Sequence, residues 1–156
     1  MQKISPCLWF DGQAEAAADF YVSIFRNSRK LETTCYPEGL PRPAGSVLTV
    51  RFVIDGQEFT ALNGGPEYLL TPAVSFAVIA ETQEEADELW EQLTAGGEEG
   101  QCGWLKDRFG VSWQIIPKGF HALFNSPDAA ARKRVVAAMM AMRKLDIGVL
   151  RRAAGN

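Results

Sequence analysis

The chain has 156 residues, of which 47% are hydrophobic and 22% charged, and its net charge is −3. Length and composition predict one globular domain, 1–156, with a substantial core. A mildly acidic chain has no overall attraction for phosphate backbones, and no apolar run approaches the roughly 20 residues that span a bilayer, so we expect neither a nucleic-acid nor a membrane partner. The sequence starts with no signal-peptide pattern, and three widely spaced cysteines suit a reducing compartment, so we expect a cytoplasmic protein.

Hydrophobic periodicity predicts alternating strands and helices along the chain. Segments with strand character lie at 3–10, 29–36, 47–54, 57–63, 73–80, 103–106 and 111–117. Helical spacing lies at 13–26, from Thr82 to the Gly96-Gly97 stop, from Ser126-Pro127 to about 144, and at 145–154. Asp11 is the expected cap of the first helix, Thr82 and Glu85 form a capping box, and Asp55-Gly56 predicts a hairpin turn.

The two halves of the sequence resemble each other at fixed offsets. At an offset of 70 the matched pairs are Ser5 and Ser75, Gln13 and Gln83, Glu15 and Glu85, Ala16 and Ala86, and Phe20 and Trp90. At an offset of 54, residues 56–60 lie over residues 110–114. Coincidence between two amphipathic α+β segments is the alternative, but the matches favour an internal duplication. We therefore predict two βαβββ repeats, about 3–63 and 73–117, with C-terminal helices at about 127–154.

Three segments carry a resemblance to a known family: WFDGQAEAAADFYVSIF, LNGGP and CGWLKDRFGVSWQI. The sequence resembles the PhnB-like branch of the vicinal oxygen chelate superfamily, the glyoxalase/bleomycin-resistance/dioxygenase fold. The resemblance implies an α+β protein whose two repeats form curled mixed sheets around a cavity, and commonly a homodimer. Members often carry the label 3-demethylubiquinone methyltransferase, but this chain has no Gly-rich strand-to-helix turn to hold a nucleoside cofactor, so we expect no cofactor.

The resemblance also implies where a metal would lie. Metal-dependent members use one position on the first strand and one on the last strand of each repeat, which correspond here to Ser5, Thr60, Ser75 and Gln114. Hydroxyl and amide groups are poor ligands for a divalent transition metal compared with imidazole and carboxylate. The single histidine, His121, follows the last strand. We therefore expect no metal and a small-molecule ligand in the cavity.

Residues 111–116 contain polar side chains inside an apolar strand. Alternation separates Val111, Trp113 and Ile115, which we expect under the helices, from Ser112, Gln114 and Ile116, which we expect to face the cavity. A solvated sheet face is the alternative for Gln114. Trp9, Trp104 and Trp113 could stack on a ligand, although aromatic residues in strands commonly belong to the core.

Other residues admit both a binding and a structural interpretation. Asn63, before Gly64-Gly65, ends a strand where the backbone could approach a ligand or simply bend. Cys102 has no nearby base, so an inert thiol that is buried or lines the cavity is favoured over a nucleophile. We expect Cys7 and Cys35 in the core. We expect Lys106, Asp107 and Arg108 in an exposed turn with a weak ion pair, and the basic residues after 131 on a solvated helix face.

Three functional hypotheses follow from these expectations. The first is a metal-free small-molecule binding protein with the candidate site residues Ser5, Thr60, Asn63, Ser75, Cys102, Trp104 and Gln114. The second is a glyoxalase- or dioxygenase-like enzyme whose metal is held by other residues. The third is a structural or interaction module whose cavity is filled by side chains.

Overall fold

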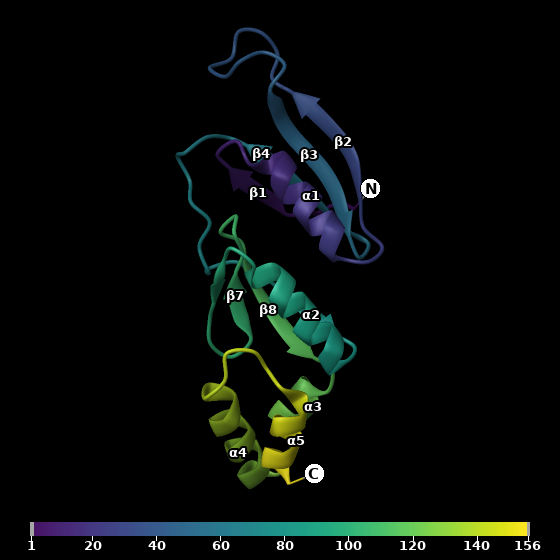
Figure 1. Ribbon diagram of the computed structural model, residues 1–156, viewed down its shortest axis with the longest axis vertical. Helices are drawn as coiled ribbons and strands as arrows, with labels where there is room; N and C mark the ends of the chain where they lie inside the picture. The colour runs from purple at the N-terminus through teal and green to yellow at the C-terminus, as the bar shows by residue number, and fades with distance from the viewer. Residues whose placement is uncertain (1, 156) are drawn as a thin grey trace. The chain divides into compact units, whose positions relative to one another are not determined.

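A computed structural model describes residues 2–155 and divides the chain into two compact units, Met1–Leu70 and Thr71–Asn156 (Figure 1). Each unit has its own four-stranded mixed sheet with a helix packed on it. The first unit contains β1 (Cys7–Phe10), α1 (Ala14–Ile24), β2 (Arg29–Cys35), β3 (Val47–Ile54) and β4 (Gln57–Asn63). Its strand order is β1-β4-β3-β2, in which β1 and β4 are parallel and the other pairs are antiparallel.

The second unit repeats this arrangement and adds helices at its end. It contains β5 (Ser75–Ala80), α2 (Gln83–Thr94), β6 (Glu98–Glu99), β7 (Trp104–Lys106) and β8 (Ser112–Pro117), then α3 (Phe120–Phe124), α4 (Ala129–Met140) and α5 (Ile147–Ala154). The strand order β5-β8-β7-β6 is that of the first sheet. The α+β fold of two βαβββ repeats with a C-terminal helical extension, predicted from the offset identities, is therefore confirmed.

The register of the sheets supports the repeat at the level of single residues. Cys7 pairs with Thr60 across the parallel strands β1 and β4, and Ala77 pairs with Gln114 across β5 and β8. Cys7 and Ala77 differ by the offset of 70, and Thr60 and Gln114 differ by the offset of 54. The two offsets found in the sequence therefore describe one common register in the two sheets.

Alternation along the strands places one face of each sheet under its helix. In the first unit, α1 buries Ala14, Ala17, Ala18 and Tyr21. Tyr21 stacks on Phe52 of β3, with a centroid distance of 6.1 Å, and Phe52 stacks on Phe59 of β4 at 5.5 Å. Burying these large side chains supplies the main driving force for joining helix and sheet. The opposite face of each sheet, here called its open face, keeps partly exposed polar side chains.

Two local features shape the first sheet. The β3–β4 turn has positive φ at both central residues, 42° at Asp55 and 82° at Gly56, as a hairpin of the predicted kind requires. The edge strand β2 is exposed at every residue, and its register against β3 shifts between Lys30 and Glu32 and again between Thr34 and Cys35. These shifts are irregularities of the β-bulge kind.

The predicted N-cap of α2 is right, whereas the predicted N-cap of α1 is wrong. Thr82 caps α2 by accepting a 3.1 Å hydrogen bond from the Glu85 amide, as predicted. The first helix is capped at Gln13 instead of Asp11, and its first amide, that of Ala14, donates to the Asn63 side chain at 2.8 Å. Asp11 forms an ion pair with Arg42 instead.

The C-terminal helices form a second core. The buried members of this cluster are Ile116, Phe120, Val135, Leu145, Ile147 and Leu150. The expected long helix starting at Ser126 is wrong at both ends. Asp128 is the N-cap of α4, where its side chain accepts hydrogen bonds from two backbone amides, and the helix stops at Met140. The turn that follows leads into α5, which matches the predicted short terminal helix. The short helix α3 was not anticipated.

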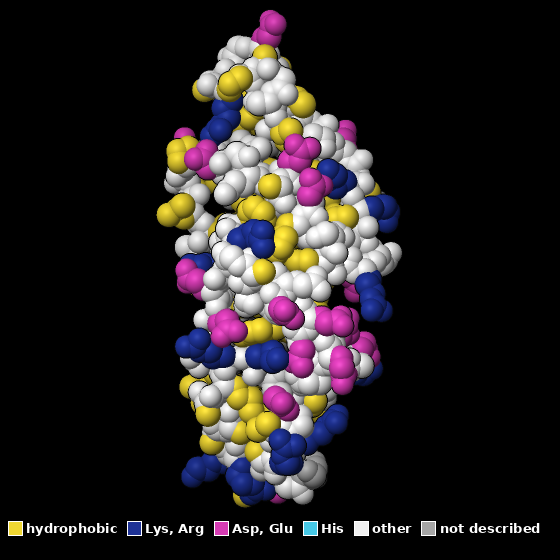
Figure 2. Space-filling model, in the orientation of Figure 1, with side chains coloured by type: hydrophobic (Ala, Val, Ile, Leu, Met, Phe, Trp, Pro, Cys, Tyr) yellow, Lys and Arg dark blue, Asp and Glu magenta, His cyan; other side chains and the backbone are white. Residues whose placement is uncertain are grey.

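Charge is unevenly distributed over the second unit. Figure 2 shows Asp and Glu side chains over α2 and Lys and Arg side chains over the C-terminal helices. Between α4 and α5, Lys144 forms an ion pair with Asp87 of α2 at 2.7 Å, and Arg143 forms one with Glu99 of β6 at 3.4 Å. Two of the basic residues predicted on a solvated helix face therefore pair with acidic residues of α2 and β6.

Two expectations about cysteines are wrong. Cys7 and Cys35 are exposed and do not lie in the core, because Cys7 is on the open face of β1 and Cys35 ends the exposed edge strand β2. All three cysteines are free thiols. No helix among the described residues is long and apolar enough to cross a bilayer.

Candidate functional site

The open face of the second sheet brings together three predicted site residues. Gln114 of β8 donates a 3.0 Å hydrogen bond from its side-chain nitrogen to the hydroxyl of Ser75, on the neighbouring strand β5. Trp104 of β7 pairs with Gln114 from the other side, which places both side chains on the same face. All three residues are partly buried. They form a row of hydroxyl, amide and indole across the centre of the sheet.

The alternation of β8 explains why Gln114 lies there. Trp113 and Ile115 are only 2% and 1% exposed and lie on the face that α2 covers, as predicted. Gln114 is on the opposite face, where it keeps partial exposure. The expectation for Ile116 is wrong: it shares the face of Gln114 but packs into the C-terminal helical core instead of facing a cavity. Ser112 is also buried.

The first sheet presents the equivalent positions differently. Thr60 is partly buried on the open face of β4, where Gln114 lies in the second repeat. Ser5 is exposed and precedes β1, so it lies outside the sheet, unlike its counterpart Ser75. The hydroxyl–amide contact of the second repeat therefore has no equivalent between Ser5 and Thr60.

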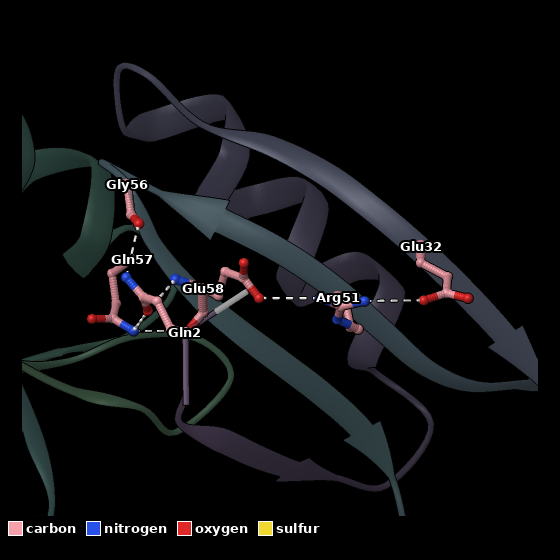
Figure 3. A network of polar contacts seen from close by, with 6 residues as sticks. All are labelled: Gln2, Glu32, Arg51, Gly56, Gln57 and Glu58. Atoms are coloured by element: carbon pink, nitrogen blue, oxygen red, sulfur yellow. Dashed lines mark hydrogen bonds and ion pairs between the residues drawn. The ribbon is translucent and has the colours of Figure 1, made fainter. Parts of the chain in front are cut away.

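A charged network crosses the open face of the first sheet beside Thr60 (Figure 3). Arg51 of β3, the antiparallel partner of Thr60, binds Glu58 with one guanidinium nitrogen at 3.1 Å and Glu32 with the other at 3.2 Å. The hydrogen bonds that Arg51 donates to Glu58, and then to Glu32, raise the pKa of Arg51 above its ordinary value. The side chains come from three adjacent strands, so the register of β2, β3 and β4 fixes the arrangement.

Gln2 anchors the hairpin end of this network. Its side-chain nitrogen donates to the carbonyl of Gly56 at 3.3 Å, and its side-chain oxygen accepts from the Glu58 amide at 3.3 Å and from the Gln57 side chain at 2.6 Å (Figure 3). The backbone of Glu58 is therefore held at the end of the sheet.

Asn63 has a structural position next to a cavity. The residue is 5% exposed, its side-chain oxygen accepts from the Ala14 amide, and its side-chain nitrogen donates to the Val47 carbonyl at 3.0 Å. These bonds join β4 to the start of α1 and to β3. A cavity of about 280 Å³ lies beside it, and its lining residues are Gly12, Glu15, Arg42, Pro43, Ser46, Val47 and Asn63.

The glycines after Asn63 receive an aromatic side chain of the chain itself. A Cβ on Gly64 would come within 2.2 Å of the Trp9 ring, so only glycine fits there. The Trp9 indole donates to the Gly65 carbonyl at 2.7 Å, and its ring meets Tyr68 edge-on with centroids 4.9 Å apart. The close backbone approach considered from the sequence is therefore made to Trp9.

Cys102 lies apart from the Gln114 row. Its φ is 56°, and its amide donates to the Met142 carbonyl at 2.9 Å. Its sulfur contacts the Met139 carbonyl oxygen at 3.6 Å and the Met140 sulfur at 3.7 Å, at the end of α4. These contacts direct the thiol towards the C-terminal helices.

The residue most clearly missed from the sequence is Asp107. It was expected in an exposed turn but is 2% exposed, and its carboxylate accepts hydrogen bonds from Phe109, Val111 and Trp113. A turn rich in charges gives no sequence signal that one member is buried. Arg51 and Glu58 were also missed, although each occupies a polar position within an otherwise apolar alternation, which is the signal that led to Gln114.

Possible metal ligands are sparse on both open faces. Within residues 2–155, no group of three or more His, Cys, Asp or Glu side chains is placed to hold a metal ion. Glu58 and Glu32 lie on the same open face as Thr60, and both bind Arg51, whose positive charge opposes a cation at that point. The donor set at the four corresponding positions thus fits hydrogen bonding to an organic molecule better than a transition metal.

Comparison with known proteins places this geometry in a family. The chain matches the family described as "3-demethylubiquinone-9 3-methyltransferase" over residues 2–116, which includes both repeats and excludes α3, α4 and α5. A solved structure described as a putative 3-demethylubiquinone-9 3-methyltransferase, PhnB protein, from Bacillus cereus is 35% identical, with a TM-score of 0.69 over 74% of this chain and 99% of that chain. No curated protein sequence matches the chain significantly.

More distant structures share the fold. Protein PA1353 from Pseudomonas aeruginosa is 22% identical, with a TM-score of 0.62 over 75% of this chain and 98% of that one. The fosfomycin resistance protein FosX from Listeria monocytogenes, described as complexed with Mn(II) and sulfate, is 16% identical, with a TM-score of 0.50 over 75% and 91% of the two chains. The repeat topology, the family match and the Bacillus cereus relative agree: the chain belongs to the 3-demethylubiquinone-9 3-methyltransferase family, the PhnB-like branch of the vicinal oxygen chelate superfamily.

Proposed function

We propose that the protein binds a small organic molecule on the open faces of its sheets, without a metal at the four positions that metal-dependent members of the superfamily use. The observation that carries this proposal is the Gln114–Ser75 pair, a hydrogen-bonded amide and hydroxyl on a partly exposed sheet face beside Trp104. Within the described residues, the Gln114 amide oxygen accepts no hydrogen bond. It is therefore available to a donor on a ligand.

The donor set separates this proposal from a metal enzyme. FosX, described with Mn(II), shows that the fold can hold a metal, but at 16% identity it supports the fold alone. Here the corresponding positions carry three hydroxyls and an amide, at Ser5, Thr60, Ser75 and Gln114. The methyltransferase label of the family receives no support from the chain, because the sequence has no Gly-rich turn for a nucleoside cofactor. A binding role, with the protein a homodimer in the cytoplasm, is the function we propose.

The test combines ligand screening with metal analysis of untagged protein. A fragment library is screened by amide chemical shifts, and hits are expected to shift the amide resonances of Gln114, Ser75 and Trp104. Gln114→Ala should weaken such hits by about tenfold, the usual effect of losing one well-placed hydrogen bond. Gln101→Ala, the same substitution at an exposed turn residue, is the matched control and should leave affinity unchanged.

Two results would contradict the proposal. One is about one equivalent of manganese, iron, nickel or zinc that is lost on mutating Gln114 or Ser75. The other is a screen in which hits bind equally well to wild type and to Gln114→Ala and move no resonance on either open face.

A further inference from the structure

We propose that the open face of the first sheet binds a small organic acid whose carboxylate binds Arg51 in place of Glu32; this inference rests on the proposed function and names the ligand class for that sheet. Arg51 lies on the open face of β3 and pairs directly with Thr60, one of the candidate binding residues. Its guanidinium binds one carboxylate at each of its two terminal nitrogens. Figure 3 shows the three side chains in a line across β4, β3 and β2.

The two carboxylates are held very differently. The Glu58 side chain is 20% exposed, and its backbone is anchored by Gln2 and by the hairpin end. The Glu32 side chain is 58% exposed and lies on the edge strand, next to a shift in register. An exposed ion pair contributes little to stability, so the Glu32 carboxylate can leave Arg51 at small cost. Glu58 would remain and keep the guanidinium oriented.

The exchange keeps the number of carboxylates bound to Arg51 at two. Arg51 is bound by two carboxylates before the exchange and by two carboxylates after it, one of them from the ligand. A planar guanidinium recognises carboxylate through directed, charge-assisted hydrogen bonds, so the ligand carboxylate would find donors already in position. The Glu32 side chain thus occupies the place of the ligand group in the unliganded protein.

The surroundings of Arg51 indicate the rest of the ligand. Thr60 lies directly opposite on β4, and the Thr49 hydroxyl, two residues along β3, shares a 2.6 Å hydrogen bond with Thr34. Leu62 of β4 is the diagonal neighbour of Arg51 and pairs with Thr49 of β3 and with Trp9 of β1. Leu62 and Trp9 therefore form an apolar strip that runs from beside Arg51 towards β1. Neighbouring strands lie about 4.8 Å apart, so a ring bonded close to a ligand carboxylate on Arg51 would reach this apolar strip. An aromatic carboxylic acid fits this surface.

The experiment compares acids with their own amides. Benzoate with benzamide and phenylacetate with phenylacetamide differ within each pair mainly in charge, so their affinity ratio isolates recognition of the anion. Titrations monitored by amide chemical shifts at fixed ionic strength should show each acid binding about tenfold tighter than its amide. Arg51→Gln should abolish this ratio. If that variant fails to fold, the wild-type ratio and the Glu32 variant still decide the question.

Glu32→Gln provides the sharper test, because the inference predicts a gain. Removing the competing carboxylate should tighten acid binding by about threefold to fivefold, the range expected from a weak exposed ion pair, and leave amide binding unchanged. Asp19→Asn is the matched control. It also removes one negative charge from an exposed ion pair, with Lys30, but belongs to α1. Asp19→Asn should change the affinity for the acids and for the amides by no more than about twofold.

The outcomes separate this inference from the proposed function. If acids and amides bind equally well, or if Glu32→Gln leaves acid binding unchanged or weaker, the ligand is not an acid held by Arg51, while small-molecule binding stands. If neither acids nor amides nor any other fragment perturbs an open face, the proposed function fails and this inference fails with it.

Discussion

The indole N–H of Trp113, on β8, donates a 2.8 Å hydrogen bond to the carboxylate of Asp107, in the turn that leads into that strand. The same carboxylate accepts from the backbone amides of Phe109, at 2.8 Å, and Val111, at 3.1 Å. One buried side chain therefore fixes the turn between β7 and β8 and the ring that packs beneath α2.

Replacing Asp107 should be strongly destabilising. Asp107→Ala leaves several buried donors without their acceptor, and we expect a loss of about 3 kcal/mol in the free energy of unfolding. Urea denaturation measures this loss. Asp19→Ala, which removes a carboxylate that is 55% exposed, should cost less than about 1 kcal/mol. Equal losses for the two variants would contradict the structural role of Asp107.

Gln114 and Trp113 should respond oppositely to truncation, although they are neighbours. Gln114 is partly exposed, so Gln114→Ala and Gln114→Leu should each cost less than about 1 kcal/mol, because water or Ser75 can adapt. Trp113→Ala should cost about 3–5 kcal/mol through the cavity that it leaves. Urea titrations separate the cases. A loss above about 2 kcal/mol for Gln114→Ala would assign the amide to the core.

Gln83 should control how firmly α5 is attached. Its side-chain oxygen accepts from the Ile147 amide at 2.8 Å, and its nitrogen donates to the Leu145 carbonyl at 3.0 Å. Gln83→Ala removes both bonds and should cost about 1–2 kcal/mol. Hydrogen exchange at the Ile147 amide should accelerate, whereas exchange in β3 of the other unit should not change. Unaltered exchange at Ile147 would show that the apolar cluster alone holds the helix.

Architecture was the part of this protein most accessible from sequence. The offsets joined Cys7 to Ala77 and Thr60 to Gln114 because equivalent strands need the same alternation, and the structure reproduces that register. Helix starts were harder. A distant partner, Asn63, binds the first amide of α1, and no local pattern near Asp11 reveals it.

The candidate site was only partly predictable, for a related reason. Alternation within β8 identified the face of Gln114, but it could not show that the C-terminal helices cover Ile116 on that face. Arg51, Glu58 and Glu32 come from three strands, and their meeting depends on register shifts in β2 that the sequence does not reveal. The local pattern predicts which face of a sheet a side chain takes, whereas the residues that it contacts there depend on how the strands and helices pack together.

Acid should loosen the start of α4. The backbone amides of Ala131 and Ala130, which donate to Asp128, lower the pKa of that carboxyl below its ordinary value of 3.8. A depressed pKa means that the ionised cap stabilises the folded state above the ordinary value, and that this contribution is lost as the pH falls through the lower, folded-state pKa.

Substitution of Asp128 isolates this effect from other titrations. Asparagine caps helices about as well as aspartate but does not titrate, so Asp128→Asn should keep the α4 amides protected as the pH falls from about 5 to 2.5. Wild type should lose protection over the lower part of that range, measured by amide exchange. Identical pH profiles for the two proteins would contradict the assignment.

The register shifts in β2 have a consequence for solubility. A seven-residue edge strand with every residue exposed presents unpaired backbone groups to which another molecule could add a strand. The two irregularities, between Lys30 and Glu32 and between Thr34 and Cys35, interrupt the regular spacing that such addition needs. The charges of Arg29, Lys30 and Glu32 along the same edge make stacking of identical strands unfavourable. The irregularity that brings Glu32 to Arg51 thus also protects the sheet from growing into aggregates.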